Sequence, residues 1–286
     1  MKLLEYYFKQ LRTVLVSDQS YLKYKFIRNL GYQPNFIIPI SLNEKINARM
    51  LYDRNPIYTQ LANKIKVRDY VTEKIGKQYL VPIIKIYAHP NEIILDELPP
   101  RFVLKCNHDS GSAIICLDKN NFSLEKAKQK LAFHLKRNLY HVTREWHYKN
   151  IKPQIICEEY IDLFNTQRPM VPTTCRIHCF QGNTHYAEID ISDTKGHEYI
   201  NVYNTLWQLQ PFTLEAPNTP VHIEVPSQFN KMLSLAEKLA QGFIYCRVDF
   251  LMSEHTLLFS EITFTPNAGR MPIKPKEWDY KLGELW

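Results

Sequence analysis

The chain has 286 residues, 45% hydrophobic and 13% aromatic, and its 36 Lys and Arg residues against 29 acidic residues give a net charge of +7. This composition excludes a disordered chain, whose mark is low hydrophobicity, and the length allows one large domain or two or three lobes. The positive charge suits an anionic partner such as a nucleotide, an acidic polymer or a membrane surface, whereas the basic tails, zinc-finger spacing and RNP-like motifs of nucleic-acid-binding proteins are missing.

The cysteines and the apolar runs indicate the compartment. None of the six cysteines belongs to a CxxC pair, and most lie in apolar runs, where a free cysteine behaves as a small hydrophobic residue. This usage is typical of a reducing cytoplasm and argues against a zinc site. No apolar run is long enough to span a bilayer, and the N-terminal segment does not have the form of a signal peptide. We therefore predict a cytoplasmic protein.

The first predicted element is an amphipathic helix in "MKLLEYYFKQLRTVLVSDQS". Helical spacing puts one set of apolar side chains on a single face, namely Leu4, Tyr7, Phe8, Leu11 and Leu15. We expect this face to pack on the protein's own core. A second interpretation is peripheral contact with the inner membrane surface, in which the anchor would also use the basic residues Lys2, Lys9 and Arg12.

The elements that follow do not alternate regularly between strand and helix. A second helix is predicted from Pro56 to about Ile75, and short strands follow in "YLVPIIKIY", "RFVLKCN" and "AIICLD". The later elements are, in order, a helix from Ser123, the strand "PQIICEEYID", a hairpin turning at Gly182-Asn183, a helix between Pro226 and Gly242, and a last hairpin. Groups of strands separated by single helices predict an α+β fold.

A loop in "FVLKCNHDSGSAII" has the residues of a phosphate site. Lys105 ends a strand, and the short loop that follows contains Ser110, Gly111 and Ser112. Glycine permits close approach of the backbone, successive N–H groups can hold phosphate oxygens, and a lysine supplies a point charge. This is not a Walker loop, because a strand follows it instead of a helix. The alternative is an ordinary hairpin with a surface lysine.

Two further strands carry polar residues. "IICEEYI" ends a buried strand with Glu158 and Glu159. Exposed backbone after such a strand could bind adenine, and the two acids could bind its amino group or the ribose. The alternative is a strand end that reaches solvent. Arg176 and His178 share one face of their strand, which either lines a cleft or is solvated.

The last hairpin, "RVDFLMSEHTLLFSEITFTP", has a carboxylate in each strand. If the turn is centred on His255, Asp249 lies opposite Glu261 with their β-carbons about 5 Å apart. Two facing carboxylates repel unless a positive charge lies between them, and Mg²⁺ is the cation that carboxylates and phosphates bind together. A two-residue turn would instead send Asp249 to the opposite face. Acids facing solvent are the alternative.

These stretches, in this order, resemble the ATP-grasp superfamily. Asn63-Lys64 stands where the superfamily has Asp-Lys, and "KCNHDSGS", "EEYI", "RVD" and "EIT" stand for its loop, hinge and metal motifs. More narrowly, "YDRNPIYTQLANKIKVRDYV", "LPPRFVLKCNHDSGS", "REWHYKNIKPQIICEEYI" and "KPKEWDYKLGEL" resemble the TupA-like ATP-grasp proteins of polysaccharide gene clusters. The resemblance runs from Leu51 to the C-terminus. Thr263 stands where the superfamily usually has an Asn as its third metal ligand. "TTCRIH" lacks the acid that usually precedes the basic residue after the hinge, and Arg176 takes the position of that basic residue.

The resemblance implies an α+β ATP-grasp fold in which two α+β lobes sandwich ATP. The region before Lys64 is too short for the usual Rossmann-like domain, so a short helical region is expected there. The predicted divisions are a helical N-terminal region over 1–62, a lobe with the lysine and the Gly/Ser loop over 63–161, and a C-terminal lobe with the metal site over 162–286.

The resemblance also implies roles for individual residues. The phosphates would be held by Lys64, Lys105 and Arg176 and covered by Ser110, Gly111 and Ser112. Adenine and ribose would be bound by Glu158, Glu159, Tyr160 and Ile161. Mg²⁺ would be held by Asp249 and Glu261, with Thr263 at the third ligand position. Arg247, with Arg176, would stabilise the transferring phosphoryl group.

The implied reaction is ATP-dependent ligation of a carboxylate to an amine through an acyl phosphate. The acceptor would be a uronic acid of a bacterial surface polysaccharide, as a glycan or a glycolipid intermediate, and the amine an amino acid. The segment "REWHYKN" offers sugar-stacking or carboxylate-binding residues, namely Arg144, Trp146 and His147, although a plain helix-to-strand linker is an alternative. Two rival functions stay open, a glycosyltransferase of the same pathway and an ATP- or glycan-binding protein without turnover.

Overall fold

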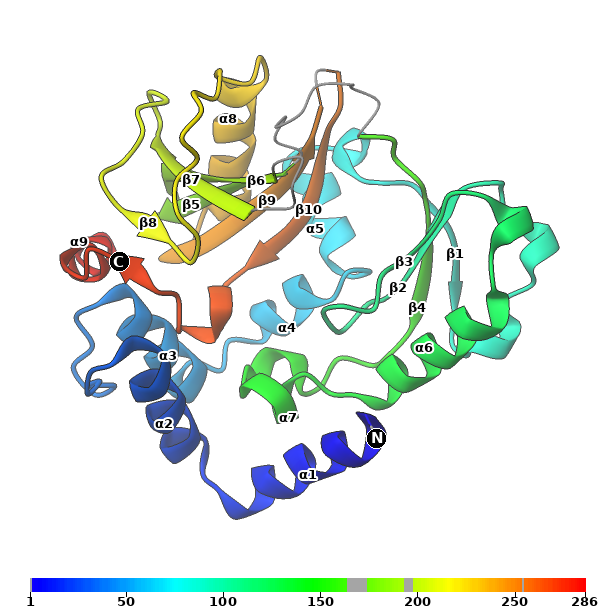
Figure 1. Cartoon of the computed structure of the whole chain (residues 1–286), viewed down its shortest axis with the longest axis horizontal. Coiled ribbons are helices and arrows are strands. Elements are labelled where there is room, and N and C mark those ends of the chain that lie inside the picture. The colour runs from blue at the N-terminus through cyan, green and yellow to red at the C-terminus, as the bar shows by residue number, and fades with distance from the viewer. Residues whose placement is uncertain (1, 164–173, 193–197, 254) are drawn as a thin grey trace. The chain divides into compact units, whose positions relative to one another are not determined.

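The computed structural model describes residues 2–163, 174–192, 198–253 and 255–286 (Figure 1). Its helices and antiparallel sheets confirm the predicted α+β class. Contacts divide the chain into unit 1 (Met1–Asp18, Arg54–Tyr70, Val81–Asp162) and unit 2 (Gln19–Asp53, Val71–Leu80, Leu163–Trp286). Residues 1–62 contribute to both units, and the predicted divisions over 1–62, 63–161 and 162–286 stay predictions.

Unit 1 is built on a four-stranded antiparallel sheet with the order β1-β4-β2-β3. Its strands are β1 (Ile83–Tyr87), β2 (Phe102–Cys106), β3 (Ile114–Cys116) and β4 (Ile155–Glu159). The helix α6 (Leu124–Lys136) contacts this sheet at β2. The core beneath α6 contains buried side chains of both the sheet and the helix, among them Phe102, Leu104, Leu131, Ile155 and Cys157. The other side of the sheet carries Lys105 and Glu158.

The predicted helix from Pro56 to about Ile75 is broken in two. The structure has α4 (Pro56–Ala62) and α5 (Val67–Lys74), and between them the side chain of Asn63 accepts a hydrogen bond from the backbone N of Ile65 (2.9 Å). An asparagine side chain that binds nearby backbone competes with the helical hydrogen bonds. The break gives Lys64 a position outside a helix.

Unit 2 is built on a five-stranded antiparallel sheet with the order β10-β9-β5-β6-β7. In chain order the strands are β5 (Thr174–Phe180), β6 (Asn183–Ser192), β7 (Glu198–Asn204), β9 (Tyr245–Met252) and β10 (Leu257–Thr263). One face is apolar and is covered by the helix α8 (Phe229–Ala240), which contacts β5, β6 and β9. This leaves the polar side chains of the same strands on the opposite face.

The rest of unit 2 is mainly helical. It contains α2 (Asp18–Leu30), whose first residue belongs to unit 1, and α3 (Leu42–Tyr52), which packs on α9 (Glu277–Glu284). The Asp279 carboxylate ties these helices together, since it accepts hydrogen bonds from the backbone N of Asn43 (3.0 Å) and the hydroxyl of Tyr32 (2.9 Å). A small two-stranded sheet pairs β8 (Thr213–Leu214) with β11 (Ile273–Lys274).

The N-terminal helix α1 (Lys2–Leu15) forms as predicted, but the prediction that its apolar face packs on the core is wrong. The five side chains of that face are between 52% and 74% exposed. The helix packs instead through its opposite side on α7 (Tyr140–Thr143), also in unit 1 (Figure 1). Nowhere in the described ranges does a helix combine the length and the hydropathy that crossing a membrane requires.

Arg144 joins α1 to α7 from a completely buried position. Its guanidinium donates to the backbone oxygens of Arg12 (3.2 Å) and Val16 (3.2 Å) at the C-terminal end of α1. It also lies 3.1 Å from the carboxylate of Asp18, which accepts a hydrogen bond from the hydroxyl of Tyr140 (2.9 Å). The carbonyl of Arg12 also accepts from the backbone N of Val16 (2.9 Å), so the guanidinium is an additional partner there, and a cation is favourable at a helix C-terminus.

We expect Arg144→Ala to lower the free energy of unfolding by about 3 kcal/mol, because the helix carbonyls and the partly buried carboxylate of Asp18 would lose their cation. Urea unfolding followed by circular dichroism measures this loss. The matched control is Arg101→Ala, which removes an ion pair with Asp162 whose side chains are 52% and 39% exposed, and it should cost less than about 1 kcal/mol. Equal losses for the two variants would contradict the structural role of Arg144.

Candidate functional site

Lys64 lies against the loop that follows β2. Because α4 ends at Ala62, the backbone N of Lys64 is free of the helix and donates to the carbonyl of Asn107 (3.0 Å). Its ammonium donates to the carbonyl of Asp109 (2.7 Å). The structure thus brings Lys64 to the predicted phosphate loop, about forty residues further along the chain.

Buried polar side chains hold this loop in place. Asn107 is fully buried, donates to the carbonyl of Lys152 (3.0 Å) and accepts from the backbone N of Gln154 (2.8 Å). Asp109 is hydrogen-bonded to His134 of α6. Burial raises the pKa of the Asp109 carboxyl, but the bonds from His134 and from Ser112 outweigh burial and lower it. The loop is therefore attached to both the sheet and the helix.

The three loop residues predicted to cover phosphates have different environments. Ser112 is buried, and its hydroxyl accepts a hydrogen bond from the backbone N of Cys106 (2.9 Å), so it braces the loop. Ser110 and Gly111 are exposed, and Gly111 has a φ of +83°, a conformation that favours glycine. Contact of all three with phosphates stays a prediction, and Ser110 and Gly111 are the accessible pair.

Lys105 and Glu158 form an ion pair on the open face of the unit 1 sheet. The Lys105 ammonium lies 2.5 Å from the Glu158 carboxylate, and the guanidinium of Arg68 lies 3.7 Å from its other oxygen. Glu158 is buried, whereas about a quarter of the Lys105 side chain is exposed. Glu158 therefore anchors two cations, and Arg68 is a basic residue that the sequence analysis missed.

The rest of the predicted hinge diverges from Glu158. Glu159 is exposed and, by the alternation of a strand, points to the other side of the sheet. Tyr160 carries the guanidinium of Arg101 over its ring, 5.1 Å from the centroid, and Ile161 is half-buried. The binding of adenine and ribose by these residues stays a prediction.

A row of charged side chains crosses the unit 2 sheet. Residues paired across antiparallel strands project from the same face, and the pairs are Arg176 with Glu188, Arg176 with Asp249, and Asp249 with Glu261. The next row contains His178, Arg247 and Thr263. The two carboxylates predicted to converge therefore do share a face.

The pairing of Asp249 with Glu261 depends on a β-bulge. Near the turn the register pairs Leu257 with Met252 and Phe259 with Phe250, which differs by one residue from a turn centred on His255. A shift between Phe259 and Glu261, at Ser260, then restores the pairing of Glu261 with Asp249. The predicted partners are correct, but the expected symmetric turn is wrong; Glu254 within it lies outside the described residues.

A guanidinium lies between the two carboxylates. Arg247 donates two hydrogen bonds to Asp249, from Nε (2.9 Å) and Nη2 (2.8 Å), and the same Nη2 lies 3.9 Å from Glu261. Burial raises the pKa of Asp249 to about 6; Arg247 opposes this rise, and the charge of Glu261 adds to it. Asp249 is thus a buried carboxylate whose charge Arg247 only partly compensates.

Glu188 and Asp190 of β6 hold the second arginine and were missed by the sequence analysis. Arg176 forms ion pairs with both, and His178 is hydrogen-bonded to Glu188 (3.1 Å). Burial raises the pKa of Glu188, but the bond from His178 and the charge of Arg247 outweigh burial and hold it well below the usual range. The alternation in "AEIDIS", facing the alternation of Arg176 and His178, is the signal that could have revealed them.

The residues of this face fit a hard divalent cation. Asp249 and Glu261 supply carboxylate oxygens on one face, and Thr263 donates a hydrogen bond to Glu261 (3.2 Å), which places a hydroxyl beside them. Mg²⁺ is bound by one or two carboxylates together with substrate phosphates. Within the described residues, no group of three or more His, Cys, Asp or Glu side chains is placed to hold a metal ion.

The residues predicted to bind a glycan are mostly internal. Arg144 is fully buried in contacts with α1, and His147 is 3% exposed and packs on Tyr148, with 4.5 Å between ring centroids. Trp146 is half-buried, with the guanidinium of Arg54 5.1 Å from its ring centroid. Of the three predicted residues, Trp146 is the one that keeps exposed surface.

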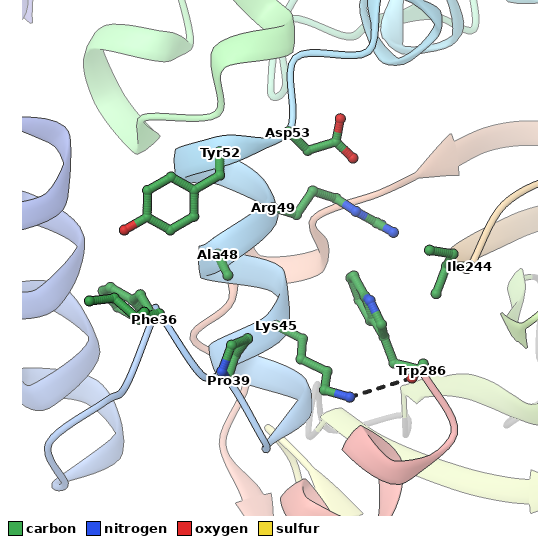
Figure 2. Close-up of a pocket in the computed structure, with 10 residues that line it drawn as sticks. Phe36, Pro39, Lys45, Ala48, Arg49, Tyr52, Asp53, Ile244 and Trp286 are labelled. Atoms are coloured by element: carbon green, nitrogen blue, oxygen red, sulfur yellow. Dashed lines mark hydrogen bonds between the residues drawn. The ribbon is translucent and has the colours of Figure 1, made fainter.

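A separate pocket of unit 2, of about 420 Å³, does not include any of the predicted residues (Figure 2). Its wall includes Phe36, Tyr52 and Trp286. Its cations are occupied by the protein itself, since Lys45 donates to the carbonyl of Gly283 (2.9 Å) and Arg49 stacks on Trp286 at 4.0 Å. The pocket therefore presents mainly apolar surface.

Comparison with known proteins identifies a family. The family model described as TupA-like ATPgrasp matches residues 44–286, whereas no curated protein matches the chain. Among solved structures, the D-alanine–D-alanine ligase from Bacillus anthracis complexed with ATP is 13% identical over 72% of this chain and 54% of its own, with a TM-score of 0.39.

Two further solved structures are similarly distant. The ATP-grasp ligase PsnB complexed with minimal precursor is 10% identical over 73% of this chain and 53% of its own, with a TM-score of 0.41. The D-alanine–D-alanine ligase from Helicobacter pylori is 10% identical over 79% and 59%, with a TM-score of 0.40. The chain spans little more than half the length of these structures, and the likenesses are too weak to add to the family match.

The charged row yields a prediction about stability. Glu188→Gln should lower the free energy of unfolding by about 3 kcal/mol, because the buried Arg247 and the partly buried Arg176 would lose their shared anion. Asp190→Asn is the matched control, since Asp190 also pairs with Arg176 but its side chain is 35% exposed; it should cost less than about 1 kcal/mol. Urea unfolding measures both, and a smaller loss for Glu188→Gln than for its control would refute the anchoring role.

Proposed function

Because the chain belongs to the TupA-like ATP-grasp family, we propose that it is an ATP-dependent ligase that joins a carboxylate to an amine. The observation that carries this proposal is the charged row of unit 2, in which Asp249 and Glu261 share a face with Arg176 and Arg247. That row combines oxygen ligands for a cation with guanidinium groups for phosphate oxygens.

The reaction overcomes the poor reactivity of a carboxylate. The substrate carboxylate takes the γ-phosphoryl group and becomes an acyl phosphate; the amine then attacks the acyl carbon, loses a proton, and phosphate leaves as the amide forms. Mg·ATP supplies the phosphoryl group and the divalent charge that neutralises it. The task left to the protein is positioning and electrostatic stabilisation.

In unit 2, the proposed positioning is done by the two arginines. Arg247 is fixed to Asp249 by two hydrogen bonds, and Arg176 is fixed to Glu188 and Asp190. Guanidinium groups held in this way do not have to be reorganised when charge develops on a phosphoryl group. We assign them to the transferring phosphoryl group and the acyl phosphate, and Asp249 and Glu261, with Thr263 beside them, to Mg²⁺.

In unit 1, the proposed nucleotide contacts are made by two lysines and the loop. Lys105 is held by Glu158 at 2.5 Å, and Lys64 by the carbonyl of Asp109 at 2.7 Å. We assign both to phosphate oxygens, with Ser110 and Gly111 above them. The residues from Glu159 to Ile161 are assigned to adenine and ribose.

The proposed acceptor is a uronic acid of a surface polysaccharide or its lipid-linked intermediate, and the proposed amine is an amino acid. The net charge of +7 supports an anionic acceptor, and Trp146 offers a partly exposed ring for a sugar. Six free, buried cysteines support a reducing compartment, the cytoplasm, where ATP is available.

The function is tested by measuring ADP release while amino acids are screened against uronic-acid oligosaccharides, with neutral oligosaccharides as controls. We expect ADP release that needs Mg²⁺, an amine and a uronic acid, and Lys105→Met should lower it at least about 100-fold while the fold survives. Lys85→Met is the matched control, because Lys85 lies in the same sheet and its pair with Glu97 is exposed.

Two other outcomes would replace the proposal. Folded protein that binds Mg·ATP in calorimetry but never releases ADP would indicate a binding protein without turnover. Transfer from a nucleotide sugar, without ADP formation, would indicate a glycosyltransferase. If the folded wild type does not bind ATP in the presence of Mg²⁺, the ligase proposal is wrong.

Glu261→Gln tests the metal assignment. The change removes a like charge beside Asp249, so the melting temperature should stay within a few degrees of wild type. It also removes a carboxylate ligand, so the rate should fall by about 100-fold and the Mg²⁺ requirement should rise. Glu224→Gln is the control, since that side chain is 89% exposed in unit 2. Full Mg²⁺-dependent activity in Glu261→Gln would disprove the assignment.

A further inference from the structure

The helix α1 turns its apolar face outward. Its large apolar side chains recur at helical spacing, lie on one arc, and are between 52% and 83% exposed: Leu4, Tyr7, Phe8, Leu11, Val14 and Leu15. A monomeric protein does not usually keep so continuous an apolar stripe in water, and such a stripe marks a surface that is covered in use.

Polar contacts fix this orientation. On the opposite side of the helix, Tyr6 is 5% exposed and its hydroxyl accepts a hydrogen bond from the backbone N of Asn138 (2.8 Å). The hydroxyl of Thr13 lies 3.2 Å from Nδ1 of His141, and Arg144 binds the carbonyls at the end of the helix. Hydrogen bonds are directional, so a rotation that buried the apolar face would break all of these contacts.

Charge indicates what covers the face. Arg12 lies at one edge of the apolar arc, whereas Lys9 lies on the opposite side of the helix in an ion pair with Glu5 (2.7 Å). Unit 1, which contains α1, carries 19 Lys and Arg residues against 13 acidic residues, a net charge of +6. A covering surface that is anionic at its rim and apolar beneath complements this arrangement. A second copy of the face would bring like charge to the rim, whereas a bilayer with anionic headgroups has both required properties.

We infer that α1 docks the protein on an anionic lipid surface. The helix lies in the plane of the headgroups, with the leucines and Phe8 reaching the acyl boundary and Tyr7 at the interface, as aromatic residues do there. Its 14 residues span about 21 Å, and because they lie flat the whole face makes contact. The inference concerns location and does not depend on the proposed ligase activity.

The test is flotation of the full chain with vesicles of phosphatidylcholine, with or without 30% phosphatidylglycerol. We expect wild type to float with the anionic vesicles at low salt and to bind neutral vesicles at least about tenfold more weakly. The double variant Phe8→Glu, Leu11→Glu should lose binding by about tenfold or more, because each charge would have to enter the acyl boundary. The matched control is Leu206→Glu, Val225→Glu, which adds the same charge at side chains 77% and 51% exposed, and it should bind like wild type.

A second measurement does not depend on these glutamates. In Phe8→Trp, brominated lipid should quench tryptophan emission more than in wild type, because the new ring contacts acyl chains. The inference is overturned if wild type does not float with anionic vesicles, or if the Phe8 and Leu11 variant floats like its control while circular dichroism shows both folded. It is also overturned if the variant instead converts a dimer to a monomer and lipid binding is absent, which would make the face a contact between copies.

Discussion

The Glu188 carboxylate is the group on which the charged face of unit 2 depends. It is buried, accepts from His178, pairs with Arg176 and lies 3.9 Å from Arg247. Burying an anion costs free energy unless cations and hydrogen bonds surround it, and the buried guanidinium of Arg247 carries the same requirement. The three groups therefore stabilise one another, and their mutual positions follow from the strand register. With Arg247 so held, Asp249 has a fixed partner, and Glu261 is aligned beside it.

The sequence predicted the fold class and the face of the hairpin, but not how the register is made. The alternation of side chains along each strand places Asp249 and Glu261 on the same face only if the position of the turn is known. A symmetric turn at His255 was the simplest choice. The structure reaches the same pairing through a bulge at Ser260. A bulge adds one residue to one strand without a distinctive local pattern, so a single sequence does not reveal it. The break at Asn63 was hidden for a similar reason, since Asn is tolerated within a helix.

Amphipathic periodicity showed that α1 would have two faces but not which one would pack on the protein. The usual rule sends the apolar face inward because burial of apolar area is favourable. Here the side chains and carbonyls of the polar face are hydrogen-bonded to unit 1. Asn138 binds Tyr6, His141 binds Thr13, and Arg144 binds the carbonyls at the end of the helix. Those partners are more than a hundred residues away along the chain, so they were not visible in the local pattern.

Three of the cations assigned to the nucleotide and phosphoryl group, one in unit 1 and two in unit 2, are each held by a carboxylate. Lys105 has Glu158, Arg176 has Glu188 and Asp190, and Arg247 has Asp249. Such pairing keeps a long side chain in one rotamer, which reduces the entropy that a ligand would have to remove. In the proposed assignment, Asp249 would hold Arg247 in place for the phosphoryl group and would also contribute an oxygen to a divalent cation, so one carboxylate would position both groups.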